Sequence, residues 1–312
     1  MATTANAHAV VKKLRRFFGH FPQVAAITSR LHQLISYQCA GEEPEHLMLL
    51  GDPGTGKSTL LRWFVKQFPR VEHAEMTESP VLYVEVPSNC SIKKLAGSML
   101  QELGSPFWNK GDEADRTFQV KTLLKGCRTR MVILDEINHA VDRGQQKSHE
   151  AVADWIKQLS GQARIPFVLA GISRSRLLLE ANDQLTDRFR EILELTPLGV
   201  GDKAQESEFA VVMEAFEGML EGIGHIDLKS AEVLRTLAFA TAGRLRNIRK
   251  LMVRSVELAS REAVPDIGLS VLEKAFLEVI FKNATAQQNP FSEKFRGTPI
   301  NKAGEPFAPA PR

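Results

Sequence analysis

The chain has 312 residues, 43% of them apolar, so it is long enough for one large or two modest domains with a substantial core. Its formal net charge of +3 is too small to indicate a nucleic-acid partner by itself. Three widely spaced cysteines without a CxxC pair argue against a zinc knuckle and a disulfide framework, and without an apolar run of 18 residues or a signal peptide we expect a cytoplasmic protein with no membrane contact.

Residues 1–45 precede the first predicted strand, and we expect this N-terminal preface to be helical. It contains a small basic cluster made of Lys12, Lys13, Arg15 and Arg16. Such a cluster fits either a solvated helix face or a contact with DNA or with a neighbouring subunit.

Short apolar strands alternate with helical patterns from residue 46 to residue 198. The predicted strands are 46–50, 81–86, 131–134, 167–170 and 192–195, and one intervening helix is predicted over 148–160. Apolar runs of this kind, mostly without alternation, are typical of parallel strands covered by helices on both faces. The pattern predicts an α/β doubly wound domain over residues 46–198.

The first strand runs directly into a complete phosphate-binding loop, Gly-Asp-Pro-Gly-Thr-Gly-Lys-Ser, at residues 51–58. Its glycines allow the backbone to curl so that successive N–H groups point at phosphate oxygens. Lys57 is placed to reach the β- and γ-phosphates, and the Ser58 hydroxyl to ligate Mg²⁺. The predicted binding residues for a nucleoside triphosphate are Gly51, Asp52, Pro53, Gly54, Thr55, Gly56, Lys57, Ser58 and Thr59. The alternative, an ordinary glycine-rich turn, does not account for the flanking strand and helix.

A second acidic motif completes this chemistry. The apolar strand at 131–134 is followed by Asp135 and Glu136. Two adjacent acids at the end of a buried strand are costly without a cation nearby. We therefore expect Asp135 to hold the Mg²⁺ shell together with Ser58, and Glu136 to orient and polarise the attacking water.

After the sheet domain the predicted strands stop. Amphipathic helical patterns occur around 209–220, 234–237, 245–258 and 271–280, which predicts a helical lid subdomain over 199–282. The last segment, 283–312, contains five prolines and little periodicity, so we expect an extended or disordered, flexible tail.

The order of these motifs resembles that of the AAA+ ATPases. In such proteins a polar residue after the next strand senses the γ-phosphate, and Ser173 stands there, although a helix cap explains it nearly as well. An arginine finger precedes the last strand, where this chain has Arg188 and Arg190; of the two we favour Arg188, and a surface ion pair is the alternative. Arg246 matches the second sensor of the lid.

Several segments narrow the resemblance to the TnsC/TniB family of transposition regulators, which are related in function to MuB. They are residues 86–94, 124–127, 169–171 and 187–191, and the resemblance covers roughly residues 40–280. One departure from the family pattern is Ile172, which stands where a hydroxyl residue is expected.

The resemblance implies that the protein binds ATP with Mg²⁺ and assembles as a ring or helical filament on double-stranded DNA in the bacterial cytoplasm. It also implies that the assembly marks a target site, and that a transposase, with a target-selection protein, acts through it. Contact with DNA is then largely through phosphates, for which the matching candidates are Lys93, Lys94, Lys110 and Arg116. Few aromatic residues flank them in the sequence, which argues against stacking on single strands.

Two other functions remain open at this point. A replication-type AAA+ helicase loader or initiator shares the fold and the site, and a helix-turn-helix domain after the lid is the feature that favours it. A nucleotide-switched signalling scaffold with negligible turnover is the second alternative, and Glu136 argues against it because a switch without hydrolysis does not need that carboxylate.

Overall fold

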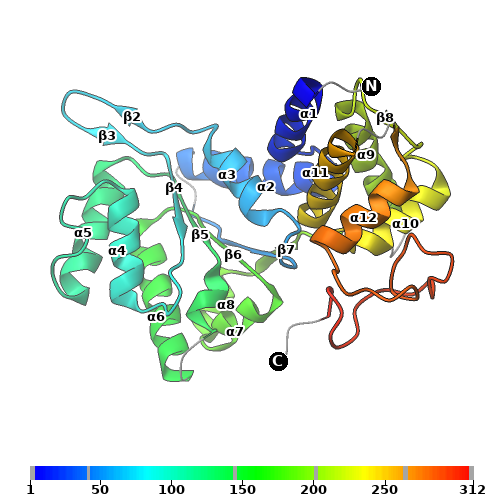
Figure 1. The fold of residues 1–312 in the computed structure, drawn as a ribbon. Coiled ribbons are helices and arrows are strands. Elements are labelled where there is room, and N and C mark those ends of the chain that lie inside the picture. The colour runs from blue at the N-terminus through cyan, green and yellow to red at the C-terminus, as the bar shows by residue number, and fades with distance from the viewer. Residues whose placement is uncertain (1–3, 41–42, 143–145, 200–202, 263–265, 309–312) are drawn as a thin grey trace. The chain divides into compact units, whose positions relative to one another are not determined.

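The computed structural model describes residues 4–40, 43–142, 146–199, 203–262 and 266–308, and its internal contacts divide the chain into two compact units (Figure 1). The α/β unit comprises residues 23–52 and 57–195. The helical unit comprises residues 1–22, 53–56 and 196–312. We describe each unit by itself.

The α/β unit is built on a parallel sheet of five strands in the order β4-β5-β6-β1-β7. The strands are β1 (Leu47–Leu50), β4 (Val81–Glu85), β5 (Met131–Asp135), β6 (Phe167–Gly171) and β7 (Glu191–Glu194). Each lies within one or two residues of its predicted position. The α/β fold class expected from the sequence is therefore confirmed.

Helices cover this sheet because its strands are apolar on both faces. Met48, Leu82 and Val132 belong to one buried cluster with residues of α4 (Ile92–Glu102), α5 (Glu113–Gly126) and α6 (Gln146–Ala163). On α3 (Lys57–Val65), which contacts β4 and β6, Leu60, Leu61 and Phe64 are buried. The ring of Phe64 in turn contacts His32 of α2 (Pro22–Cys39).

Short elements fill the connections of the α/β unit. They are the hairpin of β2 (Val71–Glu72) and β3 (Thr77–Glu78), the 3₁₀ turns η1 (Ile137–Ala140) and η2 (Ser173–Ser175), and the helices α7 (Arg176–Glu180) and α8 (Asp183–Arg188). Because the strands of the main sheet are parallel, their C-terminal ends share one edge, which we call the carboxyl edge, and their N-terminal ends share the opposite amino edge.

The helical unit contains α1 (Thr4–Arg16), α9 (Lys203–Met219), α10 (Ala231–Thr241), α11 (Leu245–Arg261) and α12 (Leu269–Val279). The last four correspond to the predicted lid helices. Helix α1 packs on α11 and α9, and the rings of Phe17 and Phe216 lie 4.5 Å apart. The expected preface is therefore not one piece, since α1 belongs to the helical unit and nearly all of α2 to the α/β unit.

Two features of the helical unit differ from the sequence-based expectation. Strands β8 (Gly224–His225) and β9 (Asp266–Ile267) pair in parallel within the lid, where no strand was expected. Two-residue strands give no periodic signal, which is why sequence patterns miss them.

The segment 283–308 is folded rather than extended or disordered. Ile300 and Phe307 are buried, the ring of Phe295 lies 5.3 Å from that of Phe239, and Arg296 forms an ion pair of 2.8 Å with Glu305. Irregularly spaced aromatic residues anchor this segment, and irregular spacing carries no helix or strand period. Residues 309–312 of the predicted tail lie outside the described residues.

A nucleotide site at the carboxyl edge

The phosphate loop occupies the turn between β1 and α3, as predicted. Gly54 and Gly56 have φ values of +88° and +112°, which residues with side chains rarely adopt. Lys57 is buried at the start of α3, and its Nζ donates hydrogen bonds to the carbonyl oxygens of Gly51, at 2.7 Å, and Asp52, at 3.1 Å. The loop thus curls around its own lysine, whose charge is held in place by backbone oxygens.

Asp135 ends β5 at the same edge and is almost completely buried. Its Oδ2 accepts a hydrogen bond of 2.6 Å from the Tyr83 hydroxyl, and its Oδ1 accepts one of 2.9 Å from the backbone N–H of Glu136. A carboxylate has about four acceptor positions, so both oxygens keep capacity for a further donor or a cation. The carboxylate is therefore fixed in direction before any ligand binds.

Tyr83 and Arg62 are site residues that the sequence reasoning missed. Burial and the bond to Asp135 both raise the pKa of the Tyr83 hydroxyl, which stays protonated and donates. The Arg62 guanidinium lies 5.5 Å from the centre of the Tyr83 ring and forms an ion pair of 3.1 Å with Glu85. Nothing in the sequence marks Tyr83, because its position beside Asp135 follows from the pairing of β4 with β5.

Glu136 follows directly after β5 in the left-handed region, with φ 56° and ψ 40°. A residue with a side chain adopts this conformation only where the surrounding structure imposes it, and such residues cluster at functional sites. The next residues form η1, where Asn138 is buried and its Oδ1 has no hydrogen-bond partner among the described residues. Sequence reasoning also missed Asn138.

The residues present fit a magnesium nucleotide. Positive-φ glycines, a buried lysine and a helix N-terminus are the elements of an anion cradle. Ser58 and Asp135 offer hard oxygen donors, and Mg²⁺ typically takes one or two such groups from a protein while phosphate and water supply the rest. Ser58 is half-buried in the first turn of α3.

The two sensor candidates lie in different units. Ser173 is exposed and begins η2, and no side-chain cap is formed there, while the neighbouring Ser175 is buried with an unpartnered hydroxyl. Arg246 is an exposed residue in the first turn of α11. Within the helical unit its backbone N–H donates a bond of 3.0 Å to the carbonyl oxygen of Gly54.

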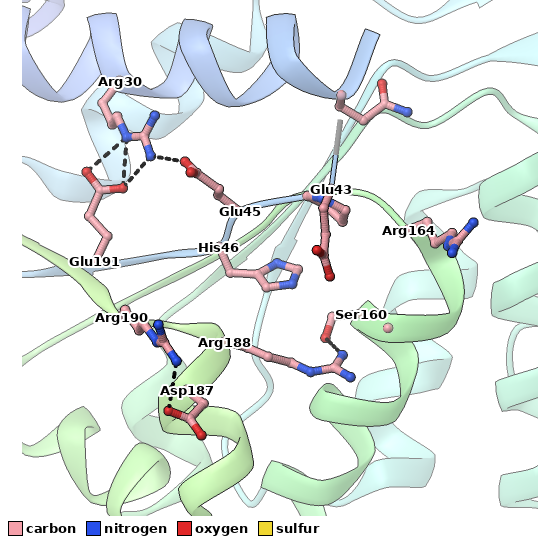
Figure 2. A pocket seen from close by; sticks show the side chains of 13 residues that line it. Arg30, Glu43, Glu45, His46, Ser160, Arg164, Asp187, Arg188, Arg190 and Glu191 are labelled. Atoms are coloured by element: carbon pink, nitrogen blue, oxygen red, sulfur yellow. Dashed lines mark hydrogen bonds and ion pairs between the residues drawn. The ribbon is translucent and has the colours of Figure 1, made fainter. Parts of the chain in front are cut away.

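Arg188 and Arg190 lie at the amino edge, immediately before β7 (Figure 2). The Arg188 guanidinium donates to the carbonyl oxygen of Lys157, at 2.8 Å, and to Ser160 Oγ, at 3.4 Å. A Cβ on Gly161 would approach Arg188 Nη1 to 2.4 Å, so this glycine makes room for the arginine against α6. Both arginines are exposed, but Arg190, which is 80% exposed, contacts the side chain of Asp187, at 3.3 Å, rather than the backbone of α6.

His46 lines the pocket at the amino edge together with Arg188 and Arg190. It is 5% exposed, its Nδ1 accepts a bond from the Phe167 N–H, and its ring stacks on Phe189, with centroids 5.0 Å apart. Burial, with a smaller contribution from Arg188, lowers the pKa of His46 to about 4. The imidazole is therefore neutral at pH 7. Figure 2 shows it between Arg188 and the ion pairs of Arg30 with Glu45 and Glu191.

The candidate DNA contacts have different structural roles. Lys93 and Lys94 are exposed in the first turn of α4, and Lys94 Nζ donates to Asn89 O at 3.3 Å. Lys110 is exposed and its Nζ lies 5.1 Å from the centre of the Phe107 ring. These three lysines are accessible to a nucleic-acid ligand.

Arg116 requires a correction. It is only 8% exposed, and its guanidinium donates to backbone carbonyl oxygens of Lys93, Lys110 and Gly111, among others. These bonds hold the loop before α5 against the start of α4. Arg116 is therefore a structural residue rather than a phosphate contact.

A second correction concerns aromatic residues near the candidate lysines. Phe107 and Trp108 are 54% and 40% exposed in the loop that Arg116 holds. A Cβ on Gly97 of α4 would lie 3.3 Å from the carbonyl oxygen of Trp108, which shows how closely the loop packs on that helix. Phe107 and Trp108 lie just before Lys110 in the sequence, whereas the fold brings their loop to α4, on which Lys93 stands.

No helix among the described residues is long and apolar enough to cross a membrane. Likewise, the described part of the chain contains no cluster of three or more His, Cys, Asp or Glu side chains suited to a metal ion.

Comparison with solved structures shows the fold. The chain is similar to the Aeropyrum pernix ORC1 protein in a complex with DNA, with a TM-score of 0.61 and 18% identity over 84% of this chain and 66% of that one. For Cdc6p from Pyrobaculum aerophilum the TM-score is 0.64, with 17% identity over 86% and 70%. For the Thermotoga maritima RuvB Holliday junction branch migration motor it is 0.51, with 18% identity over 88% and 73%. The chain thus spans about two thirds of the ORC1 chain.

At these identities the likeness shows the fold alone, and it is that of the AAA+ ATPases. A comparison with curated proteins gave no match. The family model described as bacterial TniB protein matches residues 12–196, which is more than half of the chain. The chain therefore belongs to the TniB family.

Proposed function

We propose that the protein is an ATPase that assembles on double-stranded DNA when ATP is bound and regulates DNA transposition by marking the target site for a transposase. The observation that carries this proposal is the TniB match over residues 12–196, which contains the whole carboxyl-edge site. Lys57, Asp135 and Glu136 supply phosphate binding, a cation ligand and a general base in one place on the sheet.

In this proposal each residue has a distinct task. Lys57 exchanges its bonds to loop carbonyls for bonds to phosphate oxygens, so its charge is already positioned. Ser58 and Asp135 would hold Mg²⁺, which neutralises developing charge on the phosphates when bound. Tyr83 keeps the Asp135 carboxylate in the required direction, and Glu136 orients the attacking water. Ser173 and Arg246 remain candidates for the two nucleotide sensors.

The arginine finger, in this proposal, comes from a neighbouring copy. Leu47 of β1 pairs with Glu191 of β7, so Arg190 lies beside the beginning of β1, whereas the phosphate loop follows its end. Four strand residues separate the two positions by about 13 Å. Within one chain the arginine and the loop are thus on opposite edges of the sheet, which suits a head-to-tail contact between copies.

We assign the finger to Arg190 rather than to Arg188, which the sequence favoured. Arg188 is engaged with the backbone of α6 through Lys157, and Gly161 leaves space for it there. The Arg190 side chain extends into solvent, and an exposed pair such as that with Asp187 is worth little and is easily exchanged. Arg188 then acts as the residue that holds the finger segment on α6.

DNA is contacted through phosphates by Lys93 and Lys94, with Lys110 in support. All three are exposed on α4 or on the loop that packs against it. Contacts of this kind are tolerant of sequence and sensitive to salt, as a protein that marks many target sites requires. A transposase and a target-selection protein are the partners that the family membership suggests.

Electron microscopy of the protein with duplex DNA, with and without a non-hydrolysable ATP analogue, tests the proposal. We expect rings or filaments on DNA that depend on the nucleotide. Monodisperse particles without DNA contact in both conditions would contradict it. The Glu136→Gln variant is the matched probe, because it should bind ATP, hydrolyse it at least about 100-fold more slowly and accumulate the DNA-bound assembly.

A further inference from the structure

A groove of about 750 Å³ lies between the C-terminal parts of α5 and α6. Residues of α5 and of the segment after it form one wall, and the end of α6 with the residues that follow it forms the other. Because β5 and β6 start after these helices, the groove is on the amino edge of the sheet. We call it the basic groove, because its lining includes four cationic side chains, Lys121, Lys125, Arg128 and Arg164.

The charge of the basic groove is uncompensated. Its lining contains no aspartate or glutamate, and its neutral polar side chains, on Gln38, Thr122, Thr129 and Gln162, can all donate hydrogen bonds. Within the described ranges, none of the four cations makes an ion pair at its side chain. Elsewhere on this unit, arginines such as Arg30, Arg62 and Arg176 have carboxylate partners.

Backbone strain marks two of these cations. Arg128 and Arg164 have φ values of 50° and 51°, in the left-handed region that glycine usually occupies after a helix. Such a conformation costs roughly 1 kcal/mol for a residue with a side chain. Attraction to a helix C-terminus favours a cation in the last turn. It does not account for four unpaired cations in one groove.

Thr129 provides an independent sign of a ligand. Its side chain lines the groove, is 6% exposed, and its Oγ1 has no hydrogen-bond partner in the described structure. Unsatisfied buried hydroxyls are uncommon because they lose bonds to water without replacement. Arg164 lines both this groove and the pocket of Figure 2, in which its guanidinium is directed away from Arg188 and His46.

We propose that the basic groove is a second binding site for the phosphate backbone of duplex DNA. Phosphate oxygens only accept hydrogen bonds, and the four cationic side chains of this groove only donate them. Lys121 and Lys125 are one helical turn apart, roughly 6 Å, so they can contact neighbouring phosphates of one strand. The same charges would also hold an acidic peptide, but the binding of a peptide would not change with the concentration or the length of the added DNA. The proposal rests on DNA as the ligand of the proposed function.

The groove is separate from the lysines at the start of α4. Lys93 follows the C-terminal end of β4, whereas the groove precedes β5, and the two strands pair along five residues. Five strand residues correspond to about 16 Å. The two sites therefore contact different phosphates, and together they fix the direction of a duplex along the α4–α5–α6 layer.

The test is the double variant Lys121→Glu/Lys125→Glu, with Lys66→Glu/Lys282→Glu as a control that changes the charge equally at exposed lysines outside the groove. Affinity for a fluorescent 30-base-pair duplex is measured by anisotropy over a range of KCl concentrations, with a non-hydrolysable ATP analogue. We expect the groove variant to bind at least about 10-fold more weakly at 50 mM salt. Its log–log salt slope should fall by about 2, because each phosphate contact contributes roughly 0.9. The control should change the slope by less than half of that.

Each outcome is decisive. If wild type binds no duplex with or without nucleotide, the proposed function itself fails. If wild type binds and both variants match it, only the groove proposal is overturned. Loss of self-association without DNA, at unchanged intrinsic DNA affinity, would mean that the groove receives a second copy, which also overturns it. Should the Glu variant melt at a lower temperature than the control, Lys121→Gln/Lys125→Gln replaces it, with a slope reduction of about 2 still expected.

Discussion

The carboxyl and amino edges of the sheet carry their charges in different ways. At the carboxyl edge Lys57 and Asp135 are buried; Lys57 donates hydrogen bonds to backbone oxygens, and Asp135 accepts hydrogen bonds from Tyr83 and from the Glu136 N–H. At the amino edge the Arg190 side chain extends into solvent, and the cations of the basic groove have no ion pairs among the described residues. The first edge is organised before any ligand binds, and in our proposal the second receives a partner that comes from outside.

This difference separates the edge that selects its ligand from the edge that we propose takes part in assembly. A buried charge is costly unless hydrogen bonds compensate it, so the carboxyl edge accepts only a ligand that replaces those bonds, such as a nucleotide phosphate. Exposed cations attract any polyanion at long range and lose affinity as salt screens them. In the proposed function, nucleotide binding is a property of one chain, whereas completion of the site and DNA contact are properties of the assembly.

The largest effect should come from the two arginines before β7. We expect Arg190→Ala to slow assembly-dependent ATP hydrolysis by about 1,000-fold, because fingers of this kind stabilise transition-state charge strongly. Arg188→Ala should instead lower stability, by about 1 kcal/mol, through loss of its bond to α6. Steady-state ATPase assays with urea unfolding of both variants measure this contrast. Equal rate losses with equal stability would refute the assignment to Arg190.

A stability effect of about 3 kcal/mol is expected for Arg116→Ala, since several buried carbonyl oxygens lose a charged donor. Its salt slope for DNA should equal that of wild type under conditions where it is folded. Lys93→Ala should show the reverse pattern, with normal stability and a slope reduced by about 1. Chemical denaturation and anisotropy titrations distinguish the two, and a reduced slope for Arg116→Ala would restore it as a phosphate contact.

A further predicted effect appears only when the pH is lowered. The folded-state pKa of His46, about 4, lies below the ordinary value of 6.5, so the unfolded chain takes up the proton first as pH falls. The contribution of the neutral ring to stability is complete above pH 6.5 and is lost as pH falls toward 4. Between pH 7 and 4 wild type should lose about 3 kcal/mol more than His46→Gln. Parallel losses for both proteins would show that His46 is protonated as readily in the folded state.

The two edges also differ in how much of each could be predicted from the sequence. The strands and the residues Lys57, Asp135 and Glu136 are recognisable because each motif lies within eight consecutive residues and its spacing reflects local geometry. Tyr83 is not recognisable, because its contact with Asp135 depends on strand register. The sequence favoured Arg188 over Arg190, and the packing of Arg188 against Gly161 of α6, which reverses that choice in our proposal, gives no signal in the sequence.

Other sequence-based expectations fail for reasons of long-range packing. Arg116 resembles any exposed arginine in the sequence, and its burial follows from three segments that converge on it. The segment 283–308 lacks periodicity, yet the pairing of Arg296 with Glu305 and the burial of Ile300 fold it onto the helical unit. Contacts between residues distant in the sequence leave no periodic signal.

Mixing of two inactive variants tests most directly whether the two edges of different copies form one active site. Glu136→Gln damages only the carboxyl edge, and Arg190→Ala only the amino edge. If neighbouring copies share a site, an equimolar mixture on DNA should recover about a quarter of the wild-type ATPase rate, because that fraction of random head-to-tail contacts has both edges intact. A mixture that stays as inactive as the separate variants, while still co-assembling on DNA, would contradict a site completed by a neighbour.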